Sequence, residues 1–427
     1  MKKGKPITQI LMTRFANYLK LSGTVLASML FLAAEAQDDG FIYGRVTTED
    51  GDTYEGPLRW GKEEVYWTDM FNASKKENKN LDYLTNREID ELEDRYNDRS
   101  DNIISRFVNI SWDEDNDGRF VHEFSAEFGN LKSLRIRSNN RVEVELKNGD
   151  YVQVDGSGYN DVGAKITILD KELGNVRLSW SNLDRIEFLP TPSKLAEKFG
   201  EPLYGTVVCD LGEFTGFIQW DHDERVGTDV LDGEEDGDDY EISFDKIASI
   251  ERDGYSSSLV KLKSGRMLDL RGTNDVDDDN KGIIVTVKGL GRVDIDWDEF
   301  DRVTFKSAPN SGPSYGSFAK PEKIMGTVVV DNGDKHTGEI IYDLDEEYTF
   351  ELLNGEDDNV KFIIPFSNIK EITPRGSYAA NITLKDGSKI TLEDGQDVSE
   401  KNLGMLIKTN GDRVYVPWDR VDKIILR

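Results

Sequence analysis

The stretch Val176-Arg177-Leu178-Ser179-Trp180 is followed by apolar residues at positions 183, 186 and 188. The same arrangement returns at Val293-Asp294-Ile295-Asp296-Trp297 and at Val414-Tyr415-Val416-Pro417-Trp418, each followed by apolar residues at the same spacing. Apolar residues two apart are typical of a strand with one buried face, and a spacing of three marks a single 3₁₀ turn. Each copy therefore predicts a strand, a turn and a second strand, with the tryptophan in the core.

The three copies belong to a longer internal repeat. Gly205 and Gly326 are 121 residues apart, and so are Trp297 and Trp418. Self-similarity at a fixed spacing is the signature of tandem repeats. We therefore predict three repeats, here called segment 1 (residues 37–190), segment 2 (203–308) and segment 3 (324–427).

Two proline-containing linkers separate the predicted segments, at residues 191–202 and 309–323. Proline removes a backbone donor and is disfavoured inside a sheet, so these stretches are expected to lack strand pairing. The second linker is rich in glycine and serine and is expected to be the more flexible of the two.

Each segment also contains two similar halves. In segment 3, Ile364-Pro365-Phe366 parallels Val416-Pro417-Trp418, and glycines such as Gly265 and Gly272 in segment 2 mark tight turns. The order of strand, glycine hairpin, strand, aromatic residue and 3₁₀ turn resembles the Sm-like and SH3-like small β-barrels. The resemblance implies an all-β fold in which each segment is a pair of such barrels. Members of these folds bind nucleic acids, peptides or one another, so the resemblance implies no single function.

A β-propeller is the alternative all-β fold, because Trp112, Trp220, Trp297 and Trp418 are each followed by aspartate. These tryptophans are 108, 77 and 121 residues apart. Propeller blades repeat evenly, every ~40 to 45 residues in the commonest type. The uneven spacing therefore favours the tandem small barrels.

The first 36 residues differ from the rest of the chain. Five basic residues accompany an apolar run at 21–34, which ends in Ala34-Glu35-Ala36. These features are typical of a secretory signal peptide over residues 1–36, so we expect export to the periplasm or the exterior. A membrane anchor is the alternative, but the run is shorter than the ~20 residues that span a bilayer. No later stretch is comparably apolar, and we expect no transmembrane segment in the mature chain.

The chain is strongly acidic, with 83 Asp and Glu against 53 Lys and Arg and a net charge of −30. Such a surface repels nucleic acid and attracts cations or basic partners, so we predict no nucleic-acid partner. Acidic runs at 232–241 and 275–279 are expected to be solvated hairpin tips. Cys209 is the only cysteine, which excludes an intrachain disulfide, and its place in an apolar strand predicts a buried thiol.

Segment 1 carries an insertion at about residues 72–118 that the other segments lack. Thr85-Asn86-Arg87-Glu88 has the form of a capping box, and Ile89, Leu92 and Tyr96 share one helical face. We therefore predict one short amphipathic helix after Thr85. It is expected either to cover a sheet edge or to bind a partner.

The best candidate metal ligands are Asp113, Asp115 and Asp117, which are followed by Gly118. Oxygens at positions one, three and five with glycine at six resemble the start of an EF-hand-like calcium loop, which implies calcium as the bound ion. Position twelve is Phe124 instead of a bidentate glutamate. An Asp-rich hairpin turn is therefore the alternative.

The sequence contains no recognisable catalytic constellation. The histidines at 122, 222 and 336 have no zinc-ligand spacing, and no nucleophile motif is present. Three similar units favour modular binding over a single asymmetric cleft. We therefore predict an exported, non-enzymatic scaffold, adhesion or binding protein of the cell envelope, with a protein or polysaccharide as its partner. The alternative is a secreted carbohydrate-active enzyme or carbohydrate-binding protein with its site in one segment.

Overall fold

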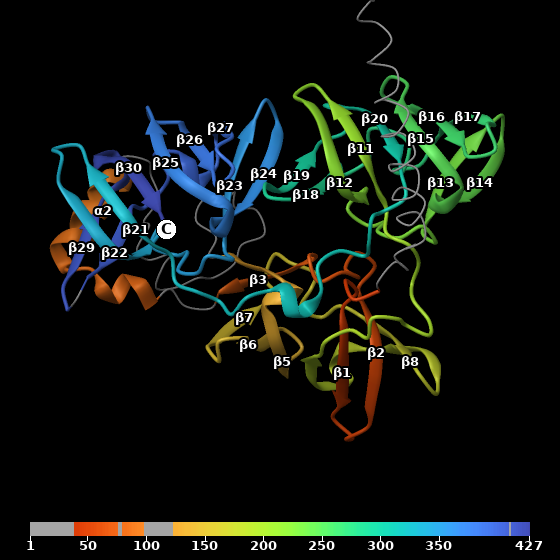
Figure 1. Ribbon diagram of the computed structural model, residues 1–427, viewed down its shortest axis with the longest axis horizontal. Coiled ribbons are helices and arrows are strands. Elements are labelled where there is room, and N and C mark those ends of the chain that lie inside the picture. Colours follow the sequence, from red (N-terminus) through yellow and green to blue (C-terminus); the bar gives the residue numbers. More distant parts are fainter. Residues whose placement is uncertain (1–37, 76–78, 98–122, 410) are drawn as a thin grey trace, which may run out of the picture. The chain divides into compact units, whose positions relative to one another are not determined.

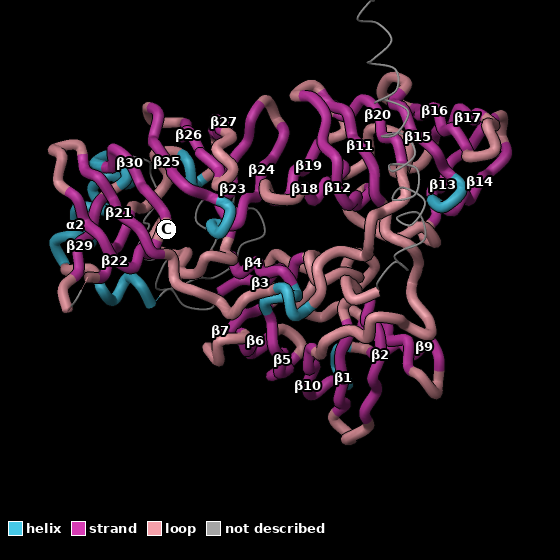
Figure 2. The backbone as a smooth tube through the Cα atoms, viewed as in Figure 1, coloured by secondary structure: helices cyan, strands magenta, loops and turns pink. Residues whose placement is uncertain are grey.

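β-Strands dominate the computed structural model, which describes residues 38–75, 79–97, 123–409 and 411–427 (Figure 1; Figure 2). The described residues form thirty strands, one α-helix and several short 3₁₀ turns, and the strands pair antiparallel. The predicted all-β fold is therefore confirmed. The predicted signal peptide, residues 1–36, lies outside the described residues.

Segment 1 forms one ten-stranded sheet. Its strands are β1 (Tyr43–Thr48), β2 (Thr53–Trp60), β3 (Met70–Lys75), β4 (Glu123–Glu127), β5 (Leu131–Ser138), β6 (Arg141–Leu146), β7 (Tyr151–Asp155), β8 (Ile166–Asp170), β9 (Gly174–Leu178) and β10 (Leu183–Phe188). β1 pairs with β2 and β10, β2 pairs with β8, and β3 pairs with β4 and β7.

Segments 2 and 3 share the second sheet, which has twenty strands. Segment 2 contributes β11 (Tyr204–Cys209), β12 (Gly212–Trp220), β13 (Val230–Glu235), β14 (Asp238–Ser243), β15 (Ile247–Arg252), β16 (Ser257–Leu262), β17 (Met267–Arg271), β18 (Ile283–Val287), β19 (Gly291–Ile295) and β20 (Phe300–Phe305). Segment 3 contributes β21 (Met325–Val330), β22 (Lys335–Ile341), β23 (Leu352–Asp357), β24 (Val360–Pro365), β25 (Ile369–Arg375), β26 (Ala379–Leu384), β27 (Lys389–Glu393), β28 (Met405–Lys408), β29 (Arg413–Val416) and β30 (Val421–Leu426).

The strand pairs of segment 1 recur in the other two segments. β11 pairs with β12 and β20, β12 with β18, and β13 with β14 and β17. In segment 3, β21 pairs with β22 and β30, β22 with β28, and β23 with β24 and β27. Segments 2 and 3 are joined by β19 and β24, in which Asp294 lies opposite Lys361.

The two halves of a segment form one continuous sheet, because one strand pairs with strands of both halves. The first part of β12 pairs with β11, and its last part, from Phe217 to Trp220, pairs with β18. Gly216 lies at the change of partner, where a Cβ atom would be 2.1 Å from the carbonyl oxygen of Thr286. No sheet closes among the described strands, so the small closed barrels expected from the sequence are not confirmed.

The tryptophans of the quoted stretch are core residues, as predicted. Trp180, Trp297 and Trp418 are only 4%, 3% and 4% exposed. Each packs at a steep angle against a second buried ring, with centroids 5.7 Å apart for Trp60–Trp180, 6.1 Å for Trp220–Trp297 and 6.2 Å for Tyr342–Trp418. This aromatic pair fills the same place in all three segments. Cys209 is buried in β11 and is a free thiol, as expected.

Helix α2 (Asn86–Asn97) begins at the predicted capping box. The Thr85 amide donates to Glu88 Oε2 at 2.7 Å, and the Glu88 amide donates to Thr85 Oγ1 at 3.3 Å. Leu92 is buried and packs, with Leu84, against an apolar cluster of segment 3: Ile341, Leu344, Leu403 and Leu406. The described face of the helix therefore packs on segment 3. The side chain of Tyr96 lies outside the described residues.

The second linker is held against segment 1, in contrast to the expected flexibility. The Tyr315 hydroxyl donates to the carbonyl of Leu131 at 2.7 Å. Lys147 Nζ donates to the carbonyl of Tyr315 at 2.6 Å and lies 3.5 Å from the centroid of its ring. The ring of Phe318 contacts Gly129, where a Cβ atom would be 2.4 Å away. Tyr315 and Phe318 thus hold in place a linker whose glycine and serine content is typical of a flexible segment.

Candidate metal sites

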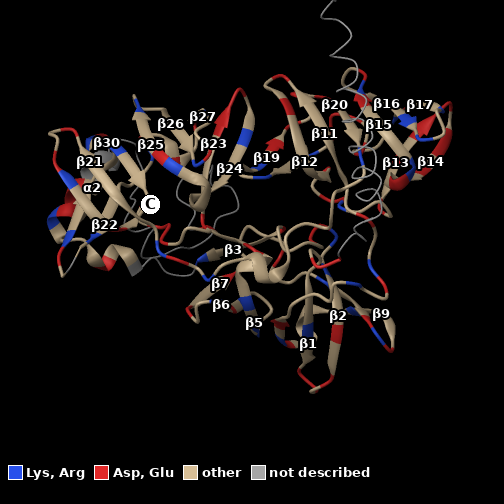
Figure 3. Cartoon of the chain, in the orientation of Figure 1, with Lys and Arg blue, Asp and Glu red and all other residues tan. Residues whose placement is uncertain are grey.

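Acidic residues, red in Figure 3, occur on strands and turns of the described chain, and several of their side chains are buried. Asp221 and Asp275 of segment 2 are 0% and 5% exposed, and Asp343 and Asp397 of segment 3 are 1% and 5% exposed. Burying an ionised carboxylate is costly unless it is paired, hydrogen-bonded or bound to a metal. These four buried aspartates therefore mark candidate functional sites in segments 2 and 3.

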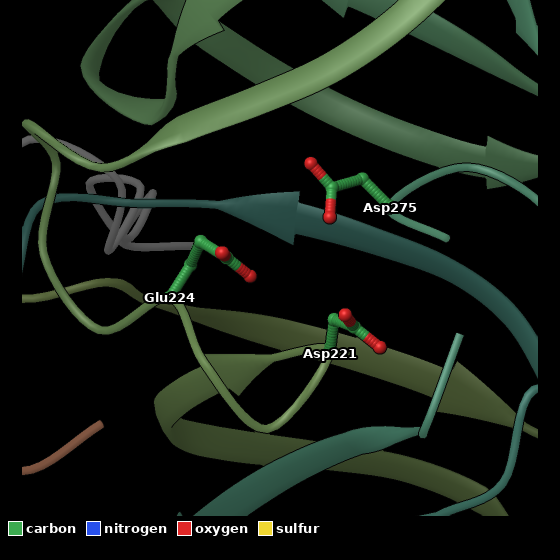
Figure 4. A group of neighbouring side chains, drawn as sticks. All are labelled: Asp221, Glu224 and Asp275. Atoms are coloured by element: carbon green, nitrogen blue, oxygen red, sulfur yellow. The ribbon is translucent and has the colours of Figure 1, made fainter. Parts of the chain in front are cut away.

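Segment 2 brings three carboxylates together. Asp221 and Glu224 lie on the turn that follows β12, and Asp275 lies on the loop that follows β17 (Figure 4). One oxygen from each lies within 4.8 Å of the other two. We call these three residues cluster 2.

The backbone of segment 2 fixes both aspartates of cluster 2. The Asp232 amide donates to Asp275 Oδ2 at 2.7 Å, and Trp220 Nε1 donates to the carbonyl oxygen of Asp275 at 2.9 Å. The Lys281 amide donates to Asp221 Oδ1 at 2.6 Å. Asp221 has a positive φ of 47°, a conformation that aspartate tolerates better than most residues. The carboxylates are therefore oriented before any ligand arrives.

Segment 3 repeats this arrangement with Asp343, Glu346 and Asp397, here called cluster 3. The Asn354 amide donates to Asp397 Oδ2 at 2.7 Å, and the Tyr342 hydroxyl donates to the carbonyl oxygen of Asp397 at 2.5 Å. Asp343 has a φ of 50° and accepts a hydrogen bond from the Leu403 amide. Tyr342 thus has the role that Trp220 has in cluster 2.

The glutamates differ from the aspartates, because each has one oxygen without a partner. Glu224 Oε2 and Glu346 Oε2 are both shielded from solvent, and neither has a hydrogen-bond partner. Within the described part of the chain, no Lys or Arg forms an ion pair with any carboxylate of cluster 2 or cluster 3. Both clusters therefore concentrate acceptors without a direct ion pair, and the longer-range charges of Lys281 on Asp221 and of Lys75 on Glu346 oppose their repulsion.

Burial and mutual repulsion raise the pKa values of these acids. The pKa of Glu224 is raised to about 9, mainly by burial and then by Asp275. Burial raises the pKa of Asp275 to about 6 and that of Asp397 to about 7, and it raises the pKa of Glu346 well above its usual range. Such groups can share protons or bind a cation. An all-oxygen donor set suits hard cations such as Ca²⁺ or Mg²⁺.

Segment 1 has only part of this arrangement. Trp60 Nε1 donates to the carbonyl oxygen of Asp161 at 2.9 Å, and the Asn72 amide donates to Asp161 Oδ2 at 2.6 Å. Glu64 is 8% exposed, and its Oε2 has no hydrogen-bond partner. The place of Asp221 and Asp343 is taken by Gly61, which has a similar φ of 57°. Segment 1 thus offers two of the three carboxylates.

The metal ligands predicted from the sequence, Asp113, Asp115 and Asp117, lie outside the described residues, so that site stays a prediction. In the acidic run 275–279, the expectation of a solvated tip is wrong for Asp275, because backbone hydrogen bonds and burial hold it inside. A signal for the clusters does exist in the sequence. The three acids of cluster 2 recur in cluster 3 at one constant shift of 122 residues.

A separate pocket of about 170 Å³ lies beside the docked linker. Its lining residues are Glu127, Asn130, Phe318, Ala319, Lys320, Pro321, Thr349, Phe350, Pro365 and Ser367. Burial raises the pKa of Glu127 to about 7, against a smaller opposing effect from Arg292. Glu127 is the single carboxylate among these lining residues.

The pKa of Glu127 leads to a testable pH dependence. Because this pKa is higher in the folded than in the unfolded state, the folded state binds the proton more tightly. Ionising Glu127 in the folded state therefore lowers the free energy of unfolding. This loss is absent below the unfolded pKa, grows as pH rises toward 7 and is complete above it. Glu127→Gln should raise the free energy of unfolding by roughly 1–3 kcal/mol at pH 8.5 and leave it nearly unchanged at pH 4.5. Urea denaturation at both pH values measures this, with the exposed Glu172→Gln as control. An equal effect at both pH values would contradict it.

Comparison with known proteins identifies no relative: no protein-family model, no curated protein and no solved structure matches the chain. Among the described residues, no helix has both the length and the apolar character needed to cross a membrane.

Proposed function

We propose that the protein is a non-enzymatic scaffold, adhesion or binding protein exported to the cell envelope and built from three tandem copies of one ten-stranded unit. The recurring strand pairs and the recurring aromatic pair support three copies of one unit. Export rests on the basic and apolar leader of the sequence.

The non-enzymatic assignment rests on the small volume of the cavity that borders Glu346. This cavity has a volume of about 20 Å³, which holds a water molecule or an ion but no sugar ring. The 170 Å³ pocket is large enough for a small ligand but is lined by one carboxylate, whereas glycoside hydrolysis generally uses two. The geometry therefore favours binding over catalysis.

Buried ion pairs between segments support a rigid scaffold. Arg225 of segment 2 donates through Nε and Nη2 to Asp69 Oδ1 of segment 1, at 2.9 and 2.7 Å. Lys75 of segment 1 contacts Asp345 Oδ1 and Glu351 Oε1 of segment 3 at 2.9 and 2.8 Å. Such contacts hold the segments as one platform on which a partner can bind.

Exposed tyrosines give this platform candidate contact residues. Tyr255 lies between β15 and β16, and Tyr378 lies in the corresponding hairpin between β25 and β26, one position further along. They are 70% and 66% exposed. Tyrosine is enriched at protein interfaces because it combines an apolar ring with a polar hydroxyl. We propose that these two hairpins take part in binding a protein or polysaccharide of the envelope.

The test is a binding experiment with the full chain immobilised and the envelope fraction of its own cells in solution. The proposal expects one saturable partner, protein or polysaccharide, whose capture is weakened by Tyr255→Ser with Tyr378→Ser. Tyr83→Ser, also exposed but outside the hairpins, is the matched control. Turnover of an envelope polysaccharide by the purified chain would overturn the non-enzymatic assignment.

A carbohydrate-binding protein is the second candidate, and the 170 Å³ pocket is the observation that favours it. Phe318 and Phe350 supply ring surfaces there, and Asn130 supplies a polar group. Binding of an oligosaccharide that is lost in Phe350→Ala, without turnover, would support this alternative.

A further inference from the structure

We propose that segments 2 and 3 each bind one calcium ion, at cluster 2 (Asp221, Glu224 and Asp275) and cluster 3 (Asp343, Glu346 and Asp397), and that segment 1 lacks such a site because of Gly61. This inference goes beyond the proposed scaffold role, since it requires no envelope partner.

The first argument is the state of the glutamate oxygens. In each cluster the two aspartates are fixed by backbone amides, whereas Oε2 of the glutamate is shielded from solvent and has no partner. Buried acceptors are nearly always satisfied, so an orphaned oxygen in a repeated position needs an explanation. A bound cation supplies the missing partner for Glu224 and for Glu346. Glu64 Oε2 of segment 1 is also without a partner, but there Gly61 stands where a third carboxylate would be, so the orphaned oxygen indicates a site only together with all three acids.

The second argument is the missing ion pair. Some buried carboxylates of the same fold have a basic partner: Asp69 pairs with Arg225, and Glu351 pairs with Lys75. In cluster 2 and cluster 3, no described Lys or Arg forms an ion pair with any of the six carboxylates. Two buried aspartates and one half-buried glutamate without an ion-pair partner repel one another, and a divalent ion removes that repulsion.

The geometry and donor chemistry indicate calcium. One oxygen from each residue of a cluster lies within 4.8 Å of the others, so all three can reach one ion at ~2.3 to 2.6 Å. The donors are carboxylates held by an irregular turn and a loop. Calcium accepts six to eight oxygens in variable geometry, whereas magnesium demands a near-ideal octahedron.

Segment 1 supplies a natural control for this inference. Gly61 has a φ of 57°, close to the 47° of Asp221 and the 50° of Asp343, so an aspartate fits the backbone there. A Cβ atom at Gly61 would lie 3.9 Å from Glu64 Oε2. It would also lie 2.5 Å from Glu63 Oε2, so the half-buried Glu63 side chain must shift and give up its hydrogen bond from the Lys62 amide. Gly61→Asp should therefore complete a third site.

The experiment counts calcium ions bound per chain after removal of metals with a chelator, by isothermal titration calorimetry and by native mass spectrometry. The variants are Glu224→Gln and Glu346→Gln, which remove charge from an oxygen that has no hydrogen bond to lose. Each should weaken its own site about tenfold or more and lower the count by one. The double variant should lower the count by two, and Gly61→Asp should raise it by one. Asp223→Asn, on the same turn but outside cluster 2, is the matched control and should leave the count unchanged.

The predicted loop at 113–117 is tested separately with Asp115→Ala and Asp117→Ala. The calcium count of each variant is compared with that of the unchanged chain, so a loss at the loop is distinguished from a loss at cluster 2 or cluster 3. Circular dichroism confirms that each variant is folded. A count that neither glutamine variant changes would overturn the proposal, and so would equal thermal stabilisation by calcium chloride and by sodium chloride of the same ionic strength. Tighter binding of magnesium than of calcium would overturn the choice of ion.

Discussion

Replacing Trp220 with alanine is expected to lower the free energy of unfolding by about 3–5 kcal/mol. Trp220 is fully buried, and its ring packs against Phe244, Trp297 and Phe300 with centroids 6.3, 6.1 and 5.4 Å away. Its indole N–H also holds the carbonyl oxygen of Asp275 at 2.9 Å. The substitution therefore leaves a cavity in the core of segment 2 and releases one residue of cluster 2.

Urea denaturation followed by circular dichroism measures this effect. Trp220→Phe is the matched control, because it keeps a ring in the core and loses the hydrogen bond and part of the volume, so we expect a loss of only about 1–2 kcal/mol. Calcium binding to segment 2 should weaken in both variants if the Asp275 loop moves. A loss below 1 kcal/mol in the alanine variant would show that Trp220 does not support the core.

Arg225→Met is expected to have the second-largest effect, also about 3–5 kcal/mol. Arg225 and Asp69 are 2% and 4% exposed, and the guanidinium also donates to the carbonyl of Ile218 at 2.7 Å. Removing the positive partner leaves a buried aspartate whose Oδ1 has lost its donors. Most of the expected loss is the cost of that uncompensated charge, not the intrinsic strength of the pair.

The reciprocal pair between the same two segments gives the control. Arg59 donates to Asp229 Oδ1 at 2.7 Å, but these side chains are 17% and 13% exposed. Arg59→Met should therefore cost less, about 1–2 kcal/mol. Denaturation midpoints of the two variants compare the effects directly. Similar losses from both would show that burial does not set the strength of these contacts.

The sequence by itself determined the features that depend on neighbouring residues. Alternating apolar residues predict the strands that flank Trp180, Trp297 and Trp418, because the side chains of a strand alternate between its faces. The capping box at Thr85 predicts the start of α2, since both of its hydrogen bonds form within four residues. The recurrence at a shift of 121 or 122 residues predicts that the strand pairs recur.

Only the tertiary structure decided which distant groups meet. Asp221 and Asp275 are 54 residues apart, and their contact depends on how β12 and the loop after β17 pack around Trp220. Nothing local distinguishes Asp275, which is buried, from Asp279, which is exposed, although both belong to one acidic run. The spacing of residues determines which face of a strand is apolar. Long-range packing determines which carboxylates lose water and whether an arginine, a proton or a cation must replace it.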